Sequence, residues 1–362
     1  DAGHEGGDMQ DSLGDGTAIA GGDAFDRIPK VELHCHVEGS VRSATVLELA
    51  RKAGRPLPVA DPHELYRYDS LDSFLAIFWL VQEVLLEPAD WSRIAYESLV
   101  DGAAHGLRYR EMFFTPARHL AAGQDLGGIV EGLTDGIEAA EAETGVRCRL
   151  IADIDRAYGP TAGFALVEAL GELRRGGRGE RVIGIGADST ELGVDLRAFA
   201  PAFLAARRLG FRRTCHAGEA VGIGPENIRI ALDVLGAERI DHGVAIAEDQ
   251  ELIRRLAGEH IPLTLCPTSN VVIANRYASL DEHPLRLLRD AGIPITINTD
   301  DPAMMELDLG EEYRRVAAAL TFTAAELAAL AVDGIGSTFL DATDQASLVA
   351  EFAGGSAPAV GP

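Results

Sequence analysis

"VELHCHVEG" occupies residues 31–39 and places two histidines, His34 and His36, one residue apart in a short apolar run. Side chains of a β-strand alternate between its two faces, so both imidazoles would point to one side and Cys35 to the other. Imidazoles about 6–7 Å apart along one strand can reach the same cation. The stretch therefore predicts a buried strand that carries two metal ligands.

Seven further β-branched or apolar runs follow this strand, and stretches with helical character separate them. Together the eight runs span residues 30–34, 107–114, 146–153, 181–187, 211–215, 238–241, 261–266 and 293–298. Strands that alternate with helices form right-handed βαβ units and a parallel sheet, and eight such units close a barrel. We therefore expect an α/β fold, a (β/α)8 TIM barrel with extra helices after the first strand and at the carboxyl terminus.

The first connection, residues 39–106, is long enough to contain several helices. Within it Leu71, Phe74, Leu75 and Phe78 form an apolar stripe with helical spacing. Such a stripe is typical of core packing. In the alternative interpretation, the helix lines the mouth of the barrel, and Phe74 and Phe78 contact an apolar ligand.

Two helix ends are visible further along the chain. Residues 323–326 (TAAE) form a capping box before an Ala/Leu-rich segment, and Gly210 follows the Ala/Arg/Leu-rich residues 201–209. We expect one helix to begin after Thr323 and another to end at Gly210.

Both ends of the chain differ in composition from its centre. Residues 1–26 are rich in Gly and Asp and contain seven acidic residues but neither Lys nor Arg, so no signal peptide is visible. This composition favours a disordered acidic tail, and we expect another flexible tail over residues 351–362. Residues 27–350 would then form a single barrel domain.

The charge balance limits the possible partners. The chain has 32 basic and 57 acidic residues, a formal net charge of −25, which repels nucleic acid and anionic lipid. Arg174, Arg175, Arg178 and Arg181 come nearest to a basic patch, but their Gly-rich surroundings indicate a solvated loop. No apolar run approaches the ~18 residues that cross a bilayer. We expect a small-molecule substrate, and neither nucleic acid nor a membrane as partner.

Four cysteines, Cys35, Cys148, Cys215 and Cys266, each lie within an apolar run. They form no CxxC pair and are too sparse for a disulfide-stabilised scaffold. We expect buried, reduced thiols in a cytoplasmic protein.

Four of the eight runs end in side chains that bind metals or transfer protons. These are His34 and His36 after the first run, His216 and Glu219 after the fifth, Asp241 and His242 after the sixth, and Asp300 and Asp301 after the eighth. The carboxyl ends of barrel strands meet at one face, where active sites lie. The imidazoles of His34, His36 and His216 with the carboxylate of Asp300 would form a nitrogen-rich site suited to zinc, with a position left for water.

A metal-bound water also needs groups that move protons and stabilise charge. Glu219 lies three residues beyond His216, after a small Ala-Gly turn that lets its carboxylate approach a ligand. It is not needed as a ligand and is therefore a candidate acid/base group. His242 could orient the attacking hydroxide and stabilise the charge that develops in the adduct.

The motifs PKVELHCHVEGS, HAGE, IDHG, CPTSN and NTDDP occur in this order. On these motifs the chain resembles the adenosine/adenine deaminase branch of the amidohydrolase superfamily, from about Ile28 to the helices near residue 340. The resemblance implies a hydrolase of purine metabolism in which a zinc-bound hydroxide attacks purine C6 and ammonia leaves. It also implies one Zn²⁺ held by His34, His36, His216 and Asp300, with Fe²⁺ or Mn²⁺ as alternatives.

The resemblance further implies roles on the substrate side. Glu219 would transfer a proton to ring nitrogen N1, His242 would stabilise the attacking hydroxide, and Asp301 would contact N7. On the adenine deaminase-like view, which the HxHxEG, GxDSxE and IDHG forms favour, Ser189 would approach the N3 edge. Glu38 stands where relatives that act on adenosine typically have Asp, and its longer carboxylate would intrude into the space of a ribose.

Several alternatives stay open on these residues. The substrate is adenine, adenosine or another 6-aminopurine, including larger nucleosides such as aminodeoxyfutalosine. A metal hydrolase that cuts a cyclic amide or phosphoester is a second class, although such enzymes often hold two metals with a bridging lysine that the fourth run, RVIGIGAD, does not offer. A binding protein that has lost activity is a third. A monomer and a homodimer are both compatible with the sequence.

Overall fold

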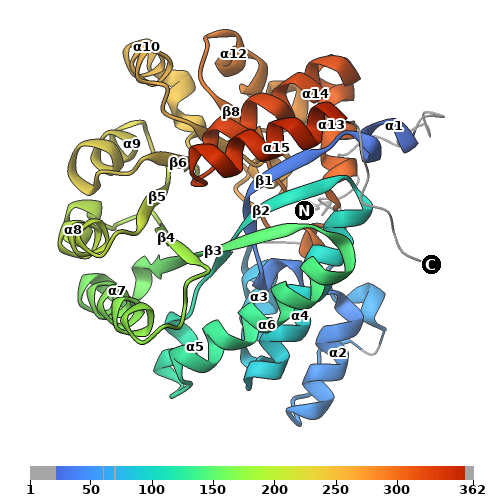
Figure 1. The fold of residues 1–362 in the computed structure, drawn as a ribbon, viewed down its shortest axis with the longest axis vertical. Helices are drawn as coiled ribbons and strands as arrows, with labels where there is room; N and C mark the ends of the chain where they lie inside the picture. Colours follow the sequence, from blue (N-terminus) through green and yellow to red (C-terminus); the bar gives the residue numbers. More distant parts are fainter. Residues whose placement is uncertain (1–21, 60, 69–70, 355–362) are drawn as a thin grey trace, which may run out of the picture.

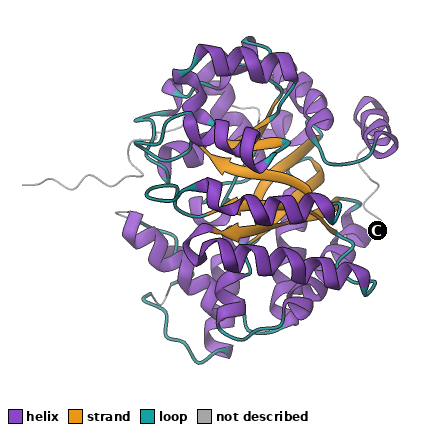
Figure 2. Cartoon of the chain, turned by 90° about the vertical axis from the view of Figure 1, so that its left-hand side faces the viewer, coloured by secondary structure: helices purple, strands orange, loops and turns teal. Residues whose placement is uncertain are grey.

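The computed structural model describes residues 22–354 except residues 60, 69 and 70. Its centre is one sheet of eight parallel strands that neighbour one another in chain order. The strands are β1 (Lys30–His36), β2 (Leu107–Phe114), β3 (Arg147–Asp155), β4 (Val182–Asp188), β5 (Arg212–Ala217), β6 (Arg239–His242), β7 (Leu263–Leu265) and β8 (Ile295–Ile297). Helices surround these strands in Figure 1 and flank them in the turned view of Figure 2. The predicted (β/α)8 barrel is confirmed.

Closure of the barrel joins β1 to the residues that follow β8. The amide of His36 donates a hydrogen bond to the carbonyl of Asp300 (2.8 Å), and the amide of Asp300 donates one to the carbonyl of His34 (3.2 Å). The last strand pairing of the barrel is therefore made by the backbone of the predicted metal ligands themselves.

The helices in the described residues include the extra ones that the sequence predicts. They are α1 (Gly22–Arg27), α2 (Ser43–Lys52), α3 (Leu71–Val84), α4 (Pro88–Ala104), α5 (Ala117–Ala121), α6 (Leu126–Thr144), α7 (Gly159–Arg175), α8 (Ala200–Arg208), α9 (Glu226–Ile230), α10 (Gln250–Glu259), α11 (Pro267–Val272), α12 (Leu285–Asp290), α13 (Leu309–Leu320), α14 (Ala324–Asp333) and α15 (Ala342–Gly354). Helices α2, α3 and α4 occupy the first connection, and α13, α14 and α15 follow β8.

Apolar side chains fill most of the space between strands and helices. Two buried ion pairs lie on opposite faces of β2, because consecutive strand residues alternate between faces. Arg239 Nη1 lies 2.6 Å from Glu111 Oε2 inside the barrel, on the amino-terminal side of the histidines of β1. Arg110 Nη2 lies 2.5 Å from Glu32 Oε2 on the helix side, where Arg110 Nη1 donates a hydrogen bond to the Ser98 carbonyl of α4 (3.0 Å). Buried charges persist only when they are paired and hydrogen-bonded.

Both expected tails are shorter than the sequence suggests. Residues 22–26, expected within the disordered tail, form most of α1, which packs on α13. Residues 351–354 belong to α15, where Phe352 is buried. In each case contact with the domain stabilises a helix that composition alone does not reveal. Residues 1–21 and 355–362 lie outside the described part of the chain.

The arginine cluster is not simply a solvated loop. Arg174 and Arg175 belong to the last turn of α7. The Arg174 guanidinium lies 3.8 Å from the ring centroid of Phe211 and donates hydrogen bonds to the carbonyls of Leu209 and Val182. This side chain therefore ties α7 to neighbouring segments.

Both predicted helix ends are confirmed. Thr323 and Glu326 form the reciprocal capping box of α14. Helix α8 ends at Arg208, and Gly210 adopts φ = 78° two residues later. All four cysteines are buried and unpaired, as expected.

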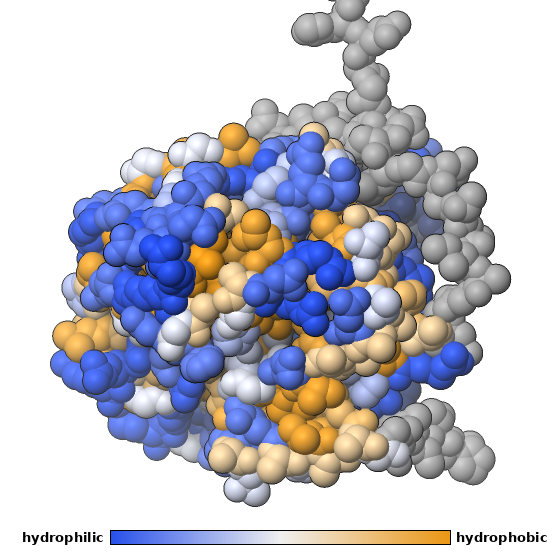
Figure 3. All heavy atoms as spheres, turned by 90° about the horizontal axis from the view of Figure 1, so that it is seen from above, coloured by the Kyte–Doolittle hydropathy of each residue, from blue (hydrophilic) through white to orange (hydrophobic). Residues whose placement is uncertain are grey.

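Helices in the described residues are too short or too polar to cross a membrane. Figure 3 shows hydrophilic residues over much of one face, with apolar residues in smaller areas between them. This surface agrees with the acidic composition of the chain.

Candidate metal centre and active site

The four predicted metal ligands converge at the carboxyl end of the barrel. His34 Nε2 lies 3.1 Å from Asp300 Oδ1, and His36 Nε2 lies 3.5 Å from the same oxygen. His36 Nε2 is also 3.2 Å from His216 Nε2. Strands β1 and β5 and the loop after β8 thus direct three imidazoles and one carboxylate to a common point.

The protonation states of these groups suit metal binding. Burial lowers the pKa of His36 to about 3 and that of His216 well below its ordinary value, so both imidazoles are neutral. Burial alone would raise the pKa of Asp300, but the neighbouring imidazoles of His34 and His242 hold it well below its usual range. His34 Nε2 is buried without a hydrogen-bond partner among the described residues. Neutral imidazoles around one carboxylate fit a divalent transition metal.

His242 lies beside this cluster and faces the substrate side. It comes within 4.8 Å of ligand atoms of His34, His216 and Asp300, so it is close enough to count as a further metal ligand. However, its Nε2 lies 3.6 Å from Glu219 Oε2, whereas 4.0 Å separates it from Asp300 Oδ2. On its other side, Asn270 Nδ2 lies 3.1 Å from its Nδ1. The predicted role of His242 on substrate stays a prediction.

Glu219 is positioned by a tight turn and by a buried carboxylate. Gly218 adopts φ = 72°, as the small Ala-Gly turn predicts. The carboxylate of Glu191 accepts hydrogen bonds from the amides of Gly218 (2.8 Å) and Glu219 (2.9 Å). Burial, reinforced by the charge of Asp300, raises the pKa of Glu219 to about 8. Its carboxyl group can therefore hold a proton at neutral pH.

Two further carboxyl groups share Thr115 on the substrate side. Glu38 Oε1 accepts a hydrogen bond from the Thr115 amide (2.9 Å), and Asp188 Oδ2 accepts one from its hydroxyl (2.5 Å). Burial is the main cause that raises the pKa of each carboxyl to about 7. Glu38 Oε2 and Asp188 Oδ1 find no hydrogen-bond partner in the described chain. Each of these buried oxygens therefore retains an unused capacity to accept a hydrogen bond.

Asp301 fits closely against the segment that follows β1. A Cβ atom at Gly39 would lie 1.8 Å from Asp301 Oδ1, so only glycine leaves room for this carboxyl group. Burial and the charge of Asp300 raise the pKa of Asp301 well above its ordinary value. A protonated Asp301 can donate a hydrogen bond to a ring nitrogen.

Left-handed backbone marks the ends of three alternate strands. Ser189, His242 and Asp300 adopt φ values of 70°, 58° and 63° after β4, β6 and β8. Such values are uncommon outside glycine and collect at functional sites. Ser189 is exposed, and its contact with substrate stays a prediction.

Two residues of the apolar stripe, Phe74 and Phe78, lie against the core, whereas the side chains of Leu71 and Leu75 lie outside the described part of the structure. Phe74 is buried in the main apolar cluster, and Phe78 packs on it with ring centroids 6.1 Å apart. Helix α3 also contacts residues 38–40 after β1. Contact of Phe74 and Phe78 with a ligand stays a prediction.

Sequence reasoning missed several polar residues at the strand ends. Asp153 and Asp155 alternate at the end of the third run as His34 and His36 do in the first, which was an available signal. For Arg156 the sequence gives no such signal. Its guanidinium donates hydrogen bonds to the carbonyls of Asp188, Ser189 and His216 and so links the ends of β4 and β5.

Comparison with known proteins agrees with this geometry. The adenosine deaminase family profile matches residues 29–353. A curated adenine deaminase of Streptomyces coelicolor is 39% identical over 323 residues, which cover 88% of this chain and 92% of the relative. The solved adenine deaminase of Arthrobacter aurescens is 32% identical with a TM-score of 0.83 and covers 90% of this chain and 98% of that one. An amidohydrolase from Burkholderia ambifaria with bound Zn is 32% identical with a TM-score of 0.85 and covers 94% of each chain.

Proposed function

Since the chain belongs to the adenosine deaminase family and is a purine aminohydrolase, we propose that it hydrolyses the 6-amino group of adenine and releases ammonia. Its metal-dependent reaction on an adenine-like substrate follows from the relatives and from the His/Asp cluster. We choose adenine as the substrate because the chain is 39% identical to a curated adenine deaminase over 88% of its length.

The metal is zinc in this proposal, and His34, His36, His216 and Asp300 hold it. A bound zinc ion supplies Lewis acidity and lowers the pKa of a water molecule to about 7. Three imidazoles, of which those of His36 and His216 are neutral, and one ionised carboxylate match the ligand types that zinc takes in catalytic sites.

The chain's own groups move the protons. Glu219 is protonated at neutral pH because burial raises its pKa to about 8, and it donates this proton to N1 of the purine. The neutral Nε2 of His242 faces Glu219 at 3.6 Å and stabilises the charge that develops at C6. Asp301, whose pKa is raised well above its ordinary value, donates a hydrogen bond to N7.

Buried acceptors on the substrate side support a free base. Free adenine has an N9–H donor that adenosine lacks, and the unpartnered oxygens of Glu38 and Asp188 can accept it. A site built to accept a hydrogen bond rejects an analogue without the donor, because its buried polar atoms are then left unpaired. In their ionised form these carboxyl groups also disfavour phosphorylated nucleosides.

An ammonia-release assay tests this function directly. The purified protein is assayed on adenine, adenosine, 2′-deoxyadenosine, N6-substituted adenines and aminodeoxyfutalosine, and its metal content is determined in the same preparation. We expect the highest kcat/KM on adenine and about one zinc per chain. A higher kcat/KM on any nucleoside contradicts the proposed substrate, and active enzyme without metal contradicts the proposed chemistry.

Glu219→Gln tests the proton donor. The amide retains the size of the side chain but cannot donate the proton, so we expect kcat to fall at least ~100-fold while zinc content is unchanged. Glu226→Gln is the matched control, because Glu226 is an exposed carboxylate of α9 that pairs with Arg197. Near-normal turnover of Glu219→Gln would remove Glu219 from this role.

A further inference from the structure

The outward nitrogens of the three metal-binding imidazoles all face buried aspartates. His34 Nδ1 lies 3.8 Å from Asp241 Oδ1, and His216 Nδ1 lies 3.8 Å from Asp241 Oδ2. His36 Nδ1 lies 4.0 Å from Asp153 Oδ2. These separations exceed hydrogen-bond length but allow attraction between each Nδ1–H and a carboxyl oxygen in a buried site. Each imidazole thus directs Nε2 to the common point and Nδ1 to a carboxyl group.

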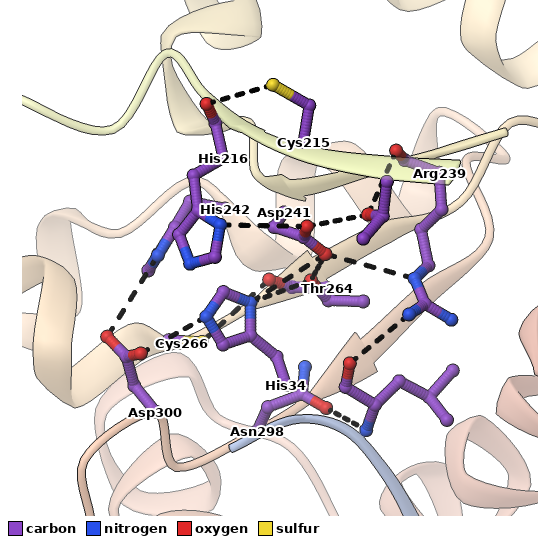
Figure 4. A network of polar contacts seen from close by, with 12 residues as sticks. His34, Cys215, His216, Arg239, Asp241, His242, Thr264, Cys266, Asn298 and Asp300 are labelled. Carbon is purple, nitrogen blue, oxygen red and sulfur yellow. Dashed lines mark hydrogen bonds and ion pairs between the residues drawn. The ribbon is translucent and has the colours of Figure 1, made fainter. Parts of the chain in front are cut away.

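Asp241 is held rigidly at the centre of this arrangement. The hydroxyl of Thr214 donates a hydrogen bond to its Oδ2 (2.6 Å), and the hydroxyl of Thr264 donates one to its Oδ1 (2.8 Å). Asp241 is fully buried. Figure 4 shows its carboxylate between the rings of His34 and His216. One carboxylate therefore serves two metal ligands that come from different strands.

Thr264 transmits the orientation of Asp241 to His34. Thr264 Oγ1 lies 3.1 Å from His34 Nδ1. Because the Thr264 hydroxyl donates its hydrogen to Asp241, its oxygen is an acceptor for His34 Nδ1–H. This chain of hydrogen bonds leaves the lone pair of His34 on Nε2, where a metal ligand needs it.

Arg239 faces both Glu111 and Asp241. Its Nη1 donates to Glu111 Oε2 at 2.6 Å, and its Nε lies 3.8 Å from Asp241 Oδ1, the same separation as that of His34 Nδ1. The positive charge of Arg239 is thus compensated mainly by Glu111. The carboxylate of Asp241 therefore faces both Arg239 and the imidazoles.

Asp153 occupies the corresponding place behind His36. It is fully buried on β3, and neither carboxyl oxygen has a hydrogen-bond partner among the described residues. A Cβ atom at Gly186 would lie 2.0 Å from Asp153 Oδ1, so glycine on the adjacent strand leaves the room for this side chain. A buried carboxyl group without a partner is costly, which calls for a role that compensates the cost.

We propose that Asp241 and Asp153 are positioning residues of the metal centre. Asp241 orients His34, through Thr264, and His216, while Asp153 orients His36, so that all three Nε2 atoms carry a lone pair toward the metal. Outer carboxylates of this kind raise the basicity of the imidazole and typically change metal affinity 10–100-fold. The inference rests on the metal ligands of the proposed function and is independent of the identity of the purine.

Zinc affinity measured by competition with a chelator tests the inference. We expect Asp241→Asn and Asp153→Asn each to bind zinc at least ~10-fold more weakly than the wild type. Asp90→Asn is the matched control, because Asp90 is a buried aspartate whose partners are Lys52 and the amides of Leu86 and Glu87. Zinc affinity within twofold of the wild type in both site variants overturns the inference. A wild type that binds no zinc contradicts the proposed function instead.

Thr264 provides a second test if an aspartate variant does not fold. Thr264→Val keeps the shape of the side chain but removes the oxygen between Asp241 and His34, whereas Thr264→Ser keeps it. We expect Thr264→Val to weaken zinc binding about 10-fold and to change the visible absorption of the cobalt-loaded enzyme, which reports ligand geometry. Thr264→Ser should retain both properties. Equal affinities and spectra for Thr264→Val and the wild type overturn the role of Asp241.

Discussion

Glu38 lies where the metal centre meets the substrate side. It follows His36 by two residues, and its carboxyl group shares Thr115 with Asp188. Its second oxygen is buried and unpartnered among the residues described. We therefore expect this carboxyl group to sense the substituent on the far edge of the purine.

Glu38→Asp should move the substrate preference toward adenosine. The shorter side chain withdraws the free oxygen by about one methylene and opens space for a ribose, a change worth ~1–3 kcal/mol in pocket discrimination. We expect the adenine-to-adenosine ratio of kcat/KM to fall about 10-fold or more. Steady-state kinetics on both substrates measures the ratio, with Glu48→Asp on the exposed side of α2 as control. An unchanged ratio would mean that Glu38 does not contact the sugar edge.

Strand periodicity explains why the sequence could predict that His34 and His36 point to the same face. His34 and His36 alternate with Cys35, and this period of two requires both imidazoles to share a face. Nothing in one sequence distinguishes an inward aspartate that supports a ligand, such as Asp153 or Asp241, from one that only fills a turn. That distinction depends on contacts between strands that are far apart in the chain.

At the scale of helices and strands, the sequence could predict those elements that are stabilised by contacts between residues close together in the chain. All eight strands appear near their expected positions, although the seventh and eighth are only three residues long, Leu263–Leu265 and Ile295–Ile297. The capping box at Thr323 was also visible, because its hydrogen bonds are made within four residues. Helix α1 was missed because its contacts are with α13, at the other end of the chain.

The carboxyl end of α13 offers a test of helix termination. Thr321 follows the last residue of this helix and adopts a left-handed backbone conformation with φ = 57°. This conformation is unfavourable for a β-branched residue. The side chain of Thr321 is exposed. Thr321→Gly should therefore raise the free energy of unfolding by about 0.5–1 kcal/mol with unchanged activity.

Urea denaturation measures this change in the free energy of unfolding. Thr144→Gly is the control variant, for which we expect a change in the opposite direction. Thr144 is the last residue of α6, so glycine there should lower stability by ~0.5–1 kcal/mol. A Thr321→Gly variant that is less stable than the wild type would show that left-handed strain does not limit this helix end.

At the scale of the whole molecule, one buried carboxyl group links two outer elements around the barrel. Glu312 of α13 accepts hydrogen bonds from the amide (2.9 Å) and the hydroxyl of Thr268 in α11. Burial raises its pKa to about 7, although the bonds from Thr268 act in the opposite direction. The folded protein therefore binds this proton more tightly than the unfolded chain.

Glu312 should make stability depend on pH between about 4.5 and 7. Because the folded-state pKa is the higher one, its contribution to the free energy of unfolding is largest below pH 4.5 and falls as the pH rises through 7. The total change is at most roughly 3 kcal/mol. Urea midpoints of the wild type and Glu312→Gln at pH 5, 6, 7 and 8 isolate this group. A constant difference between the two proteins over this range contradicts the prediction.

The barrel itself could be predicted because eight alternating units close in only one simple way. Where it closes could not be read from the sequence. The closing pairs are backbone hydrogen bonds between His34, His36 and Asp300, and these depend on the register of the complete sheet. The proposed metal ligands and the closure of the barrel consequently involve the same residues.

This shared closure has a consequence for how the protein is made. While the chain leaves the ribosome, His34 and His36 emerge first and Asp300 emerges after most of the domain, so the complete ligand set exists only when synthesis of the barrel is nearly finished. Domains fold during synthesis from the amino terminus, and pairings between distant segments form late. Metal uptake would therefore mark the completion of folding, and a prematurely terminated chain would be left without its metal.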